Sequence, residues 1–134
     1  MAAPLFDELN LLARTVFLPA GAVLFRRDEP SRSVYVVHKG NIALLWPDGQ
    51  EAAPMEVLGP GSIVGLPAAL NGSYSASAKA LIDSELGVIA TPRVVEMFES
   101  KPALCRIAMK LMGQEVARMR SLIAEHCTHI GDEL

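Results

Sequence analysis

The spacing of apolar residues divides the chain into a short helical start, a long β-rich middle and a helical end. Apolar residues between Leu5 and Leu12 recur at helical spacing, which predicts a short amphipathic helix over residues 5–13. Over residues 16–90 the apolar runs are short and separated by Gly, Pro, Asp and Asn, and Pro-Asp-Gly at 47–49 predicts a tight turn. Strands and turns at this spacing are typical of an antiparallel sandwich or barrel.

The last third of the chain predicts two helices. Thr91 before Pro92 is typical of a helix cap and first turn, and it predicts a short helix in the segment that follows. Ser100, just ahead of Pro102, predicts the start of a second helix that runs to about Glu125. Such a helix is long for so small a domain, so we expect its far end to project beyond the sheets.

The second helix carries an apolar stripe at intervals of three and four residues. We expect the stripe to pair two copies of the chain, because only the first turns of this helix can reach the β-rich unit. The alternative is that the stripe simply covers that unit. The residues of the expected dimer interface are Leu104, Ala108, Leu111, Met112, Met119 and Ile123.

Three glycine-containing segments give the chain a specific resemblance. They are LPAGAVLFRRDEP with Gly21, SVYVVHKGNIAL with Gly40, and LGPGSIVGLPAAL with Gly59, Gly61 and Gly65. In this order, over roughly residues 5–125, the chain resembles the cyclic-nucleotide-binding domain of the catabolite-activator and FNR (CRP/FNR) superfamily.

This resemblance implies a mainly β fold. We expect an antiparallel jelly-roll (double-stranded β-helix) barrel over about residues 16–90, with a short N-terminal helix and two C-terminal helices over about 92–125, the last one long. The whole chain, residues 1–134, would form a single domain. The resemblance also implies a phosphate-binding loop between two strands and a long helix that pairs two subunits.

The expected phosphate loop lacks the charged residues of the family pattern. Gly65 matches the loop glycine, but Leu66 stands where the family places a Glu for the ribose. Tyr74, or Ser75 if the loop length differs, stands where the family places an Arg for the phosphate. No arginine occurs between Arg32 and Arg93, so no shift of the alignment restores that residue. Because a guanidinium grips phosphate oxygens in pairs, binding of ordinary cyclic AMP or cyclic GMP is doubtful.

Two interpretations of this loop stay open. In one, the loop holds a ligand other than an ordinary cyclic nucleotide, through hydroxyl groups and backbone amides. In the other, it is a relic turn closed by its own side chains. The candidate ligand-binding residues are Gly65, Leu66, Pro67, Ala68, Ala69, Ser73, Tyr74 and Ser75.

Composition narrows the classes of partner. The net charge of −3, with a sequence pI near 5.6, gives no general attraction to nucleic acid. The amino terminus does not resemble a secretion signal and no apolar run approaches a membrane span, so we expect a cytoplasmic protein without membrane contact. A hydrophobic content of 51% hints at a buried partner interface, and the two cysteines, Cys105 and Cys127, are expected to be free thiols.

Motifs for metal binding or catalysis are weak. His126, Cys127 and His129 offer three ligands close together, whereas a closed zinc site needs four, so we expect no metal there. The sequence has no nucleophile elbow, zinc-protease motif, P-loop or dinucleotide fingerprint, so we expect a non-enzyme without a cofactor.

These features favour a dimeric, ligand-sensing regulatory domain. A ligand would shift the loop around residues 65–77 and reorient the long helices. One alternative is a ligand-free dimerisation or protein-interaction module. Another is the sensor half of a CRP/FNR-type transcription regulator.

Overall fold

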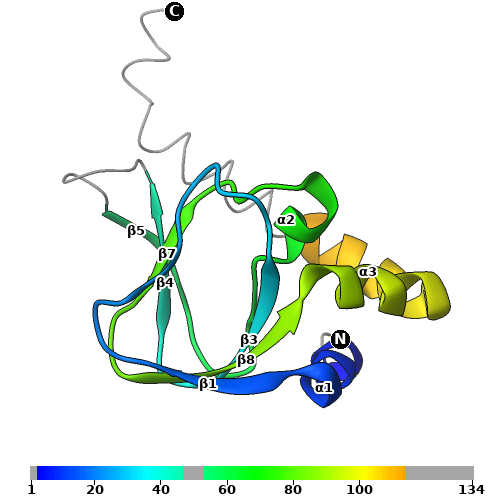
Figure 1. The fold of residues 1–134 in the computed structure, drawn as a ribbon, viewed down its shortest axis with the longest axis horizontal. Helices are drawn as coiled ribbons and strands as arrows, with labels where there is room; N and C mark the ends of the chain where they lie inside the picture. Colours follow the sequence, from blue (N-terminus) through cyan, green and yellow to red (C-terminus); the bar gives the residue numbers. More distant parts are fainter. Residues whose placement is uncertain (1–2, 47–52, 114–134) are drawn as a thin grey trace, which may run out of the picture.

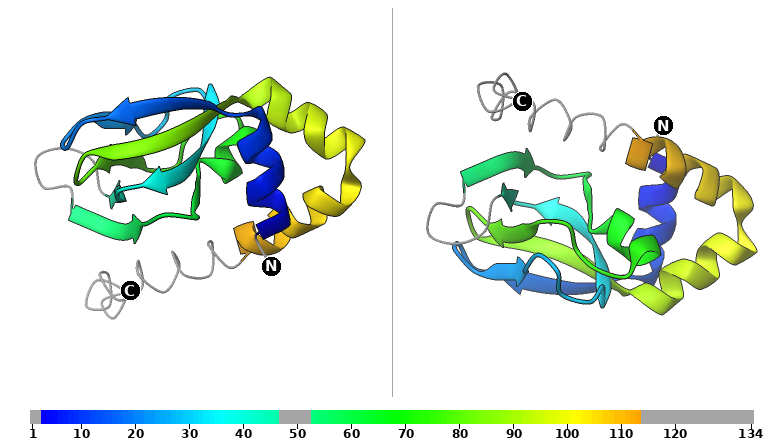
Figure 2. Two further views of the ribbon diagram at one scale, coloured as in Figure 1. Left: turned by 90° about the horizontal axis from the view of Figure 1, so that it is seen from below. Right: turned by 90° about the horizontal axis from the view of Figure 1, so that it is seen from above.

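Two four-stranded antiparallel sheets face each other, and the helices gather at one side of them (Figure 1, Figure 2). The computed structural model describes residues 3–46 and 53–113 of the chain. The first sheet has the order β1 (Arg14–Leu18), β8 (Ser84–Ala90), β3 (Ser33–Lys39) and β6 (Ile63–Val64). The second has the order β2 (Val23–Phe25), β7 (Ser77–Ala80), β4 (Ile42–Trp46) and β5 (Ala53–Leu58). This arrangement confirms the mainly β jelly-roll class.

Three helices are bounded within the described residues: α1 (Ala3–Leu12), α2 (Leu66–Asn71) and α3 (Thr91–Ser100). A further helix begins at residue 102 and is described as far as residue 113. Figure 2 shows α1, α3 and this last helix together at one end of the sheets. The turn at 47–49 and the expected end of the long helix near Glu125 lie outside the described residues. Within the described ranges, none of the helices has the length and apolar character needed to cross a membrane.

Strand β3 belongs to two hydrophobic cores because its side chains alternate between the two faces of the first sheet. Val34 and Val36 are fully buried in a core shared with the helices. Val37 is fully buried in the other core, which lies between the two sheets. The first sheet is therefore covered on both faces.

Strand β7 alternates buried and partly exposed residues. Ala78 and Ala80 are fully buried in the core between the sheets. Lys79, which lies between them, is partly exposed. Its cation therefore lies on the outer face of β7, not among the buried alanines.

The first helix begins at Ala3, two residues before the predicted start, and the two later helix starts are each wrong by one residue. The cap of α3 is Ala90, without a side-chain hydrogen bond, and Thr91 is already helical. Thr91 Oγ1 instead lies 3.0 Å from Ser31 Oγ, so a tertiary contact has displaced the local capping role. Ser100 ends α3, and its hydroxyl donates to the carbonyl of Glu96 at 3.0 Å. The next helix follows Lys101.

Candidate functional site

The loop that the sequence singles out runs from β6 through α2 to β7. Gly65 has a φ of +84° and begins α2, and Pro67 lies in the first turn of that helix. Gly72, at φ +95°, ends the helix by donating its N–H to the carbonyl of Ala68 at 2.8 Å. The two glycines turn the chain sharply at both ends of α2, so the residues after it return toward β2 and β3.

Tyr74 occupies the space in front of this loop. Its ring stacks on Phe25 of β2, with the ring centroids 3.7 Å apart and the planes 8° from parallel. Its hydroxyl donates to the carbonyl of Ser33 at 2.6 Å and accepts from the N–H of the same residue at 3.3 Å. Only 4% of Tyr74 is exposed. The side chain is therefore held by apolar stacking on its face and by hydrogen bonds at its tip.

Gly65 is needed where it lies because the Tyr74 ring approaches it closely. A Cβ atom at this position would lie 3.1 Å from Cε1 of Tyr74 and 3.5 Å from the carbonyl oxygen of Ser33. The positive φ adds a conformational demand that glycine meets without strain. The loop glycine therefore packs here against an aromatic ring of the same chain.

The cavity left beside the ring is small. Its volume is about 40 Å³, close to that of one water molecule, which occupies about 30 Å³ in the liquid. It is lined by five of the eight candidate ligand-binding residues, namely Gly65, Pro67, Ala68, Tyr74 and Ser75, and by three others, Phe25, Leu44 and Ala76. None of these side chains carries a charge, which agrees with the missing Glu and Arg of the family pattern.

The other three candidate residues lie elsewhere. Leu66 and Ala69 are buried in the core between the first sheet and the helices. The backbone of Ser73 pairs with that of Pro30 in an isolated bridge. Leu66 therefore does not line the cavity, although the resemblance predicts it at the position of the family's ribose-binding Glu.

Sequence reasoning missed Phe25 as a partner of Tyr74. The two residues are far apart in the chain, and nothing in the local pattern of β2 marks one apolar residue as a stacking partner. The segment LPAGAVLF contributes to the family resemblance, but it does not indicate that Phe25 contacts Tyr74. Only the pairing of β2 with β7 brings Phe25 beside the residues that follow the loop.

The expected dimer stripe divides into buried and partly buried residues. Leu104 and Ala108 belong to the protomer's own core, together with Leu5 and Leu9 of α1. Leu111 and Met112 are only partly buried and pack at the edge of that core. Met119 and Ile123 lie outside the described residues. Of the four described residues of the stripe, Leu111 and Met112 are therefore the ones left available for contact with a second copy. The dimer interface itself stays a prediction.

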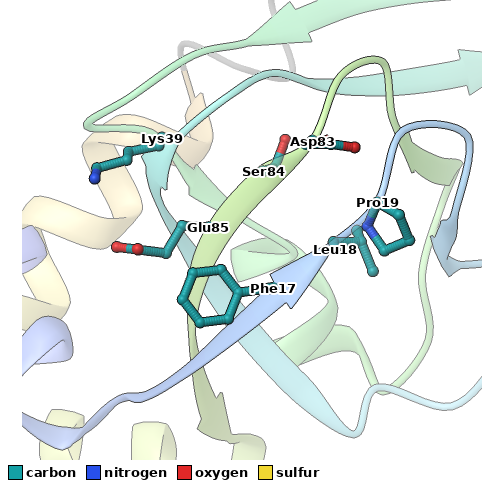
Figure 3. Close-up of a pocket in the computed structure, with 7 residues that line it drawn as sticks. All are labelled: Phe17, Leu18, Pro19, Lys39, Asp83, Ser84 and Glu85. Carbon is teal, nitrogen blue, oxygen red and sulfur yellow. The ribbon is translucent and has the colours of Figure 1, made fainter.

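A larger hollow, of about 440 Å³, lies on the first sheet away from the loop (Figure 3). Its two carboxylates, those of Asp83 and Glu85, each contact another residue and point in different directions. Asp83 accepts from the N–H of Ala20 at 2.9 Å, and Glu85 lies 3.3 Å from Nδ1 of His38. In Figure 3, Glu85 points to the side opposite Asp83. The carboxylates of Asp83 and Glu85 therefore do not converge on a common point.

No metal centre is evident in the part of the chain that the structure describes. Among those residues, no group of three His, Cys, Asp or Glu side chains is placed to hold an ion. Cys105 is a free thiol, partly buried in the helix after α3. The cluster of His126, Cys127 and His129 and the second cysteine of the chain lie outside the described ranges.

Comparison with known proteins gives the family. Residues 15–101 match the family model described as "Cyclic nucleotide-binding domain". The chain belongs to this family. Its matches to regulators of the CRP/FNR superfamily confirm the relationship that the glycine-containing segments imply.

Three relatives illustrate the relationship. The transcriptional regulatory protein btr of Bordetella pertussis is 30% identical over 118 residues, which cover 86% of this chain and 48% of that protein. The catabolite activator protein of Thermus thermophilus has the same fold, with a TM-score of 0.76 and 22% identity, over 96% of this chain and 61% of that chain. CLP of Xanthomonas campestris, described as a c-di-GMP-responsive global regulator, has a TM-score of 0.77 and 16% identity, over 96% of this chain and 64% of that chain.

The family assignment covers one part of larger proteins. The chain spans less than half the length of the curated relatives it matches. The family match concerns the cyclic nucleotide-binding domain, residues 15–101 of this chain.

Proposed function

We propose that this domain is a non-enzymatic, ligand-responsive regulatory module whose ligand is not an ordinary cyclic nucleotide. The observation that carries the proposal is the position of Tyr74. Its ring fills the space in front of the loop, and its hydroxyl is already bonded to Ser33. A cyclic nucleotide would have to displace this ring before reaching the backbone of Gly65.

The electrostatics of the loop support the same conclusion. A cyclic nucleotide carries one negative charge, which must lose water on binding and needs a compensating cation or several hydrogen bonds. The cavity beside Tyr74 is lined by uncharged side chains, and Leu66 faces the helical core. Ordinary cyclic AMP or cyclic GMP therefore gains little at this loop to offset the displacement of Tyr74.

A second candidate function is favoured by the same closed geometry. If nothing displaces Tyr74, the sheets act as a scaffold that presents the long helix to a second copy or to another protein. Leu111 and Met112 are the described residues available for that contact. In this case the module regulates through association alone.

The similarity to btr supports a place for this domain, with either candidate function, within a transcription regulator. Both would suit the sensor half of a transcription regulator, and this chain matches 48% of that regulator's length. The net charge of −3 and the absence of a basic cluster do not favour direct DNA contact by this domain itself. DNA reading would require sequence beyond the domain.

Thermal unfolding with a nucleotide panel tests the proposal. The panel contains cyclic AMP, cyclic GMP and c-di-GMP, the last because of the similarity to CLP. We expect no rise in Tm with cyclic AMP or cyclic GMP at micromolar concentration. A rise with either one would contradict the proposed loop. If no nucleotide of the panel raises Tm and the protein has the mass of a dimer, the second candidate function is favoured.

Substitution of Tyr74 tests the role given to its ring. Tyr74→Arg removes the ring and supplies the cation that the loop lacks, whereas the control Tyr74→Leu removes the ring without adding charge. We expect cyclic AMP to stabilise the Arg variant more than the Leu variant, because a guanidinium pairs with phosphate. Equal responses from two folded variants would show that Tyr74 does not set the ligand preference.

A further inference from the structure

A second cavity adjoins the aromatic stack and has a different chemistry. Its volume is about 290 Å³, and it shares Phe25 and Tyr74 with the small loop cavity. The other walls come from the segment between β2 and β3 and from the start of β3. Because ligand pockets generally begin near 300 Å³, this volume suits a small molecule and not a dinucleotide.

Opposite charges line this cavity without neutralising each other. Glu29 and Arg32 both contribute to its wall. Within the described parts of the chain they form no ion pair with each other, and Arg32 pairs with no other carboxylate there. Oε1 of Glu29 accepts the backbone N–H of Arg26 at 2.8 Å, which holds the carboxylate at its own end of the segment. The cavity therefore presents a separate anion and cation to one space.

The remaining polar groups are hydroxyls. Tyr35 and Tyr74 lie in the same wall, next to Ser33. The pKa of Tyr35 is raised from 10.0 to about 12, mainly by burial and to a smaller extent by the neighbouring Tyr74 and Glu29, while a hydrogen bond with Ser33 acts in the opposite direction. The phenol of Tyr35 therefore stays protonated at neutral pH. A wall that combines uncharged hydroxyls with one acidic and one basic residue suits a ligand that is itself polar and of zero net charge.

The segment that carries these charges is bonded to the candidate loop. The N–H of Asp28 donates to the carbonyl of Tyr74 at 2.8 Å, and the N–H of Tyr74 donates to the carbonyl of Glu29 at 3.0 Å. The N–H of Ser31 donates to the carbonyl of Gly72 at 2.8 Å. A displacement of this segment would therefore also displace the backbone of Tyr74.

The same segment is bonded to α3. The N–H of Thr91 donates to the carbonyl of Arg32 at 3.1 Å, and the hydroxyls of Thr91 and Ser31 lie 3.0 Å apart. Thr91 is the first residue of α3, which leads into the long helix. Arg32 thus contributes to the cavity wall and accepts a hydrogen bond from the first residue of α3.

We propose that this cavity binds a small zwitterion of the α-amino-acid class, with the carboxylate on Arg32 and the ammonium on Glu29. The site is distinct from the phosphate-type loop and shares only the aromatic wall with it. Occupancy tightens the segment between β2 and β3 and is transmitted through Thr91 to α3. The transmission step rests on the proposed regulatory function, whereas the binding step stands on the cavity alone.

Binding is tested on the full chain by ¹H–¹⁵N NMR. The twenty L-amino acids are titrated one at a time at millimolar concentration, with acetate and methylammonium as single-charge comparators. We expect at least one amino acid to shift the amide resonances of residues 29, 31–35 and 74, and we expect neither comparator to do so. The simultaneous use of both charges is what distinguishes a zwitterion from a simple ion.

Charge-removing variants then locate the site. Arg32→Gln and Glu29→Gln should each weaken binding about tenfold or more, since each deletes one charge-assisted contact. The Gln at position 29 keeps an oxygen for the N–H of Arg26, so the segment retains its anchor. Arg14→Gln and Glu99→Gln remove exposed charges on β1 and α3, outside the cavity lining, and should leave binding unchanged. Unchanged Tm values confirm that the variants are folded.

Three results would overturn the site: no amino acid shifts these resonances, acetate shifts them as strongly, or Arg32→Gln binds as well as the unaltered chain. The regulatory step fails separately. If an amino acid binds at residues 29–35 while the resonances of α3 do not move, the site stands and the proposed transmission is wrong. If nothing binds in this cavity but another ligand moves α3, the site is wrong and the regulatory function stands.

Discussion

The hydroxyl of Ser31 lies 3.0 Å from the hydroxyl of Thr91, which ties the segment between β2 and β3 to the first residue of α3. The backbone reinforces this tie, because Thr91 also donates its N–H to Arg32. The segment is bonded to residues 72–74 on its other side. A short stretch of chain thus connects the candidate loop with the helices that a regulatory signal must reach.

Removing this hydroxyl pair should cost a modest part of the stability. Ser31→Ala and Thr91→Val should each lower the free energy of unfolding by about 0.5–1.5 kcal/mol, the usual net value of one hydrogen bond. The double variant should lose less than the sum, because both changes break the same bond. Urea unfolding measures all three.

Ser100→Ala is the matched control for this cycle. Its hydroxyl donates only to the Glu96 carbonyl of its own helix at an exposed position, so its removal should change the free energy of unfolding very little. Strict additivity of the Ser31 and Thr91 changes would show that the two hydroxyls do not interact in solution.

Gly40 should tolerate no larger residue. It has a φ of +94°, and a Cβ there would lie 2.6 Å from Cβ of Ser84 and 2.8 Å from its Cα. Gly40→Ala should therefore lower the free energy of unfolding by more than the roughly 1–3 kcal/mol that a strained φ alone costs. Chemical denaturation gives the value.

Gly21 provides the comparison because it also has a positive φ but would place its Cβ in open space. Gly21→Ala should show the conformational cost alone. In the Gly40→Ala background, Ser84→Gly should restore part of the loss, since it removes the side chain but leaves the Cα of residue 84. Equal losses at positions 21 and 40 would contradict the steric explanation.

The fold could be predicted from the sequence because its signals are local. Turn glycines such as Gly21, Gly40 and Gly65 adopt the positive φ that their positions imply. The alternation in β7 places the alanines inside and Lys79 toward solvent. Each signal needs only a few neighbouring residues, so a single sequence contains it.

The site could be predicted only in part because its decisive contacts are tertiary. The resemblance places Tyr74 where the family has an arginine, but the stacking of Tyr74 on Phe25 depends on the packing of β2 against β7. Likewise, the burial of Leu104 depends on where α1 packs. The start of α3 is also mispredicted for this reason, because Thr91 contacts the hydroxyl of Ser31, which is distant in sequence, and does not cap the helix.

The ionisation of Tyr35 predicts a loss of stability in strong alkali. Burial raises its pKa from 10.0 to about 12, so the folded state holds the phenolic proton more tightly than the unfolded state does. This contribution is fully present below pH 10, declines as the pH rises above that value, and is lost once the pH passes about 12.

Tyr35→Phe removes the titrating group and tests this dependence. The free energy of unfolding of the variant should fall less steeply than that of the unaltered chain between pH 10 and 12, as measured by urea unfolding at each pH. The two proteins should share one pH dependence between pH 7 and 9. Parallel curves across the alkaline range would rule out Tyr35 as the source.

Substitutions in the helix after α3 should separate effects on the stability of one chain from effects on dimer formation. Leu104 is buried in the protomer's own core, so Leu104→Ala should lower the free energy of unfolding by about 2–5 kcal/mol. Leu111 lies at the edge of that core, and Leu111→Glu should instead shift the molecular mass from dimer toward monomer, because it places a charge in an apolar contact. Light scattering coupled to size exclusion gives the mass.

Arg106→Glu is the control for association. Arg106 is exposed and lies five and six positions before Leu111 and Met112, which places it on another face of the same helix. Its substitution should leave the mass unchanged. A monomeric mass for the unaltered chain at high concentration, or an equal loss of dimer in both Glu variants, would contradict a dimer formed through the Leu111 face.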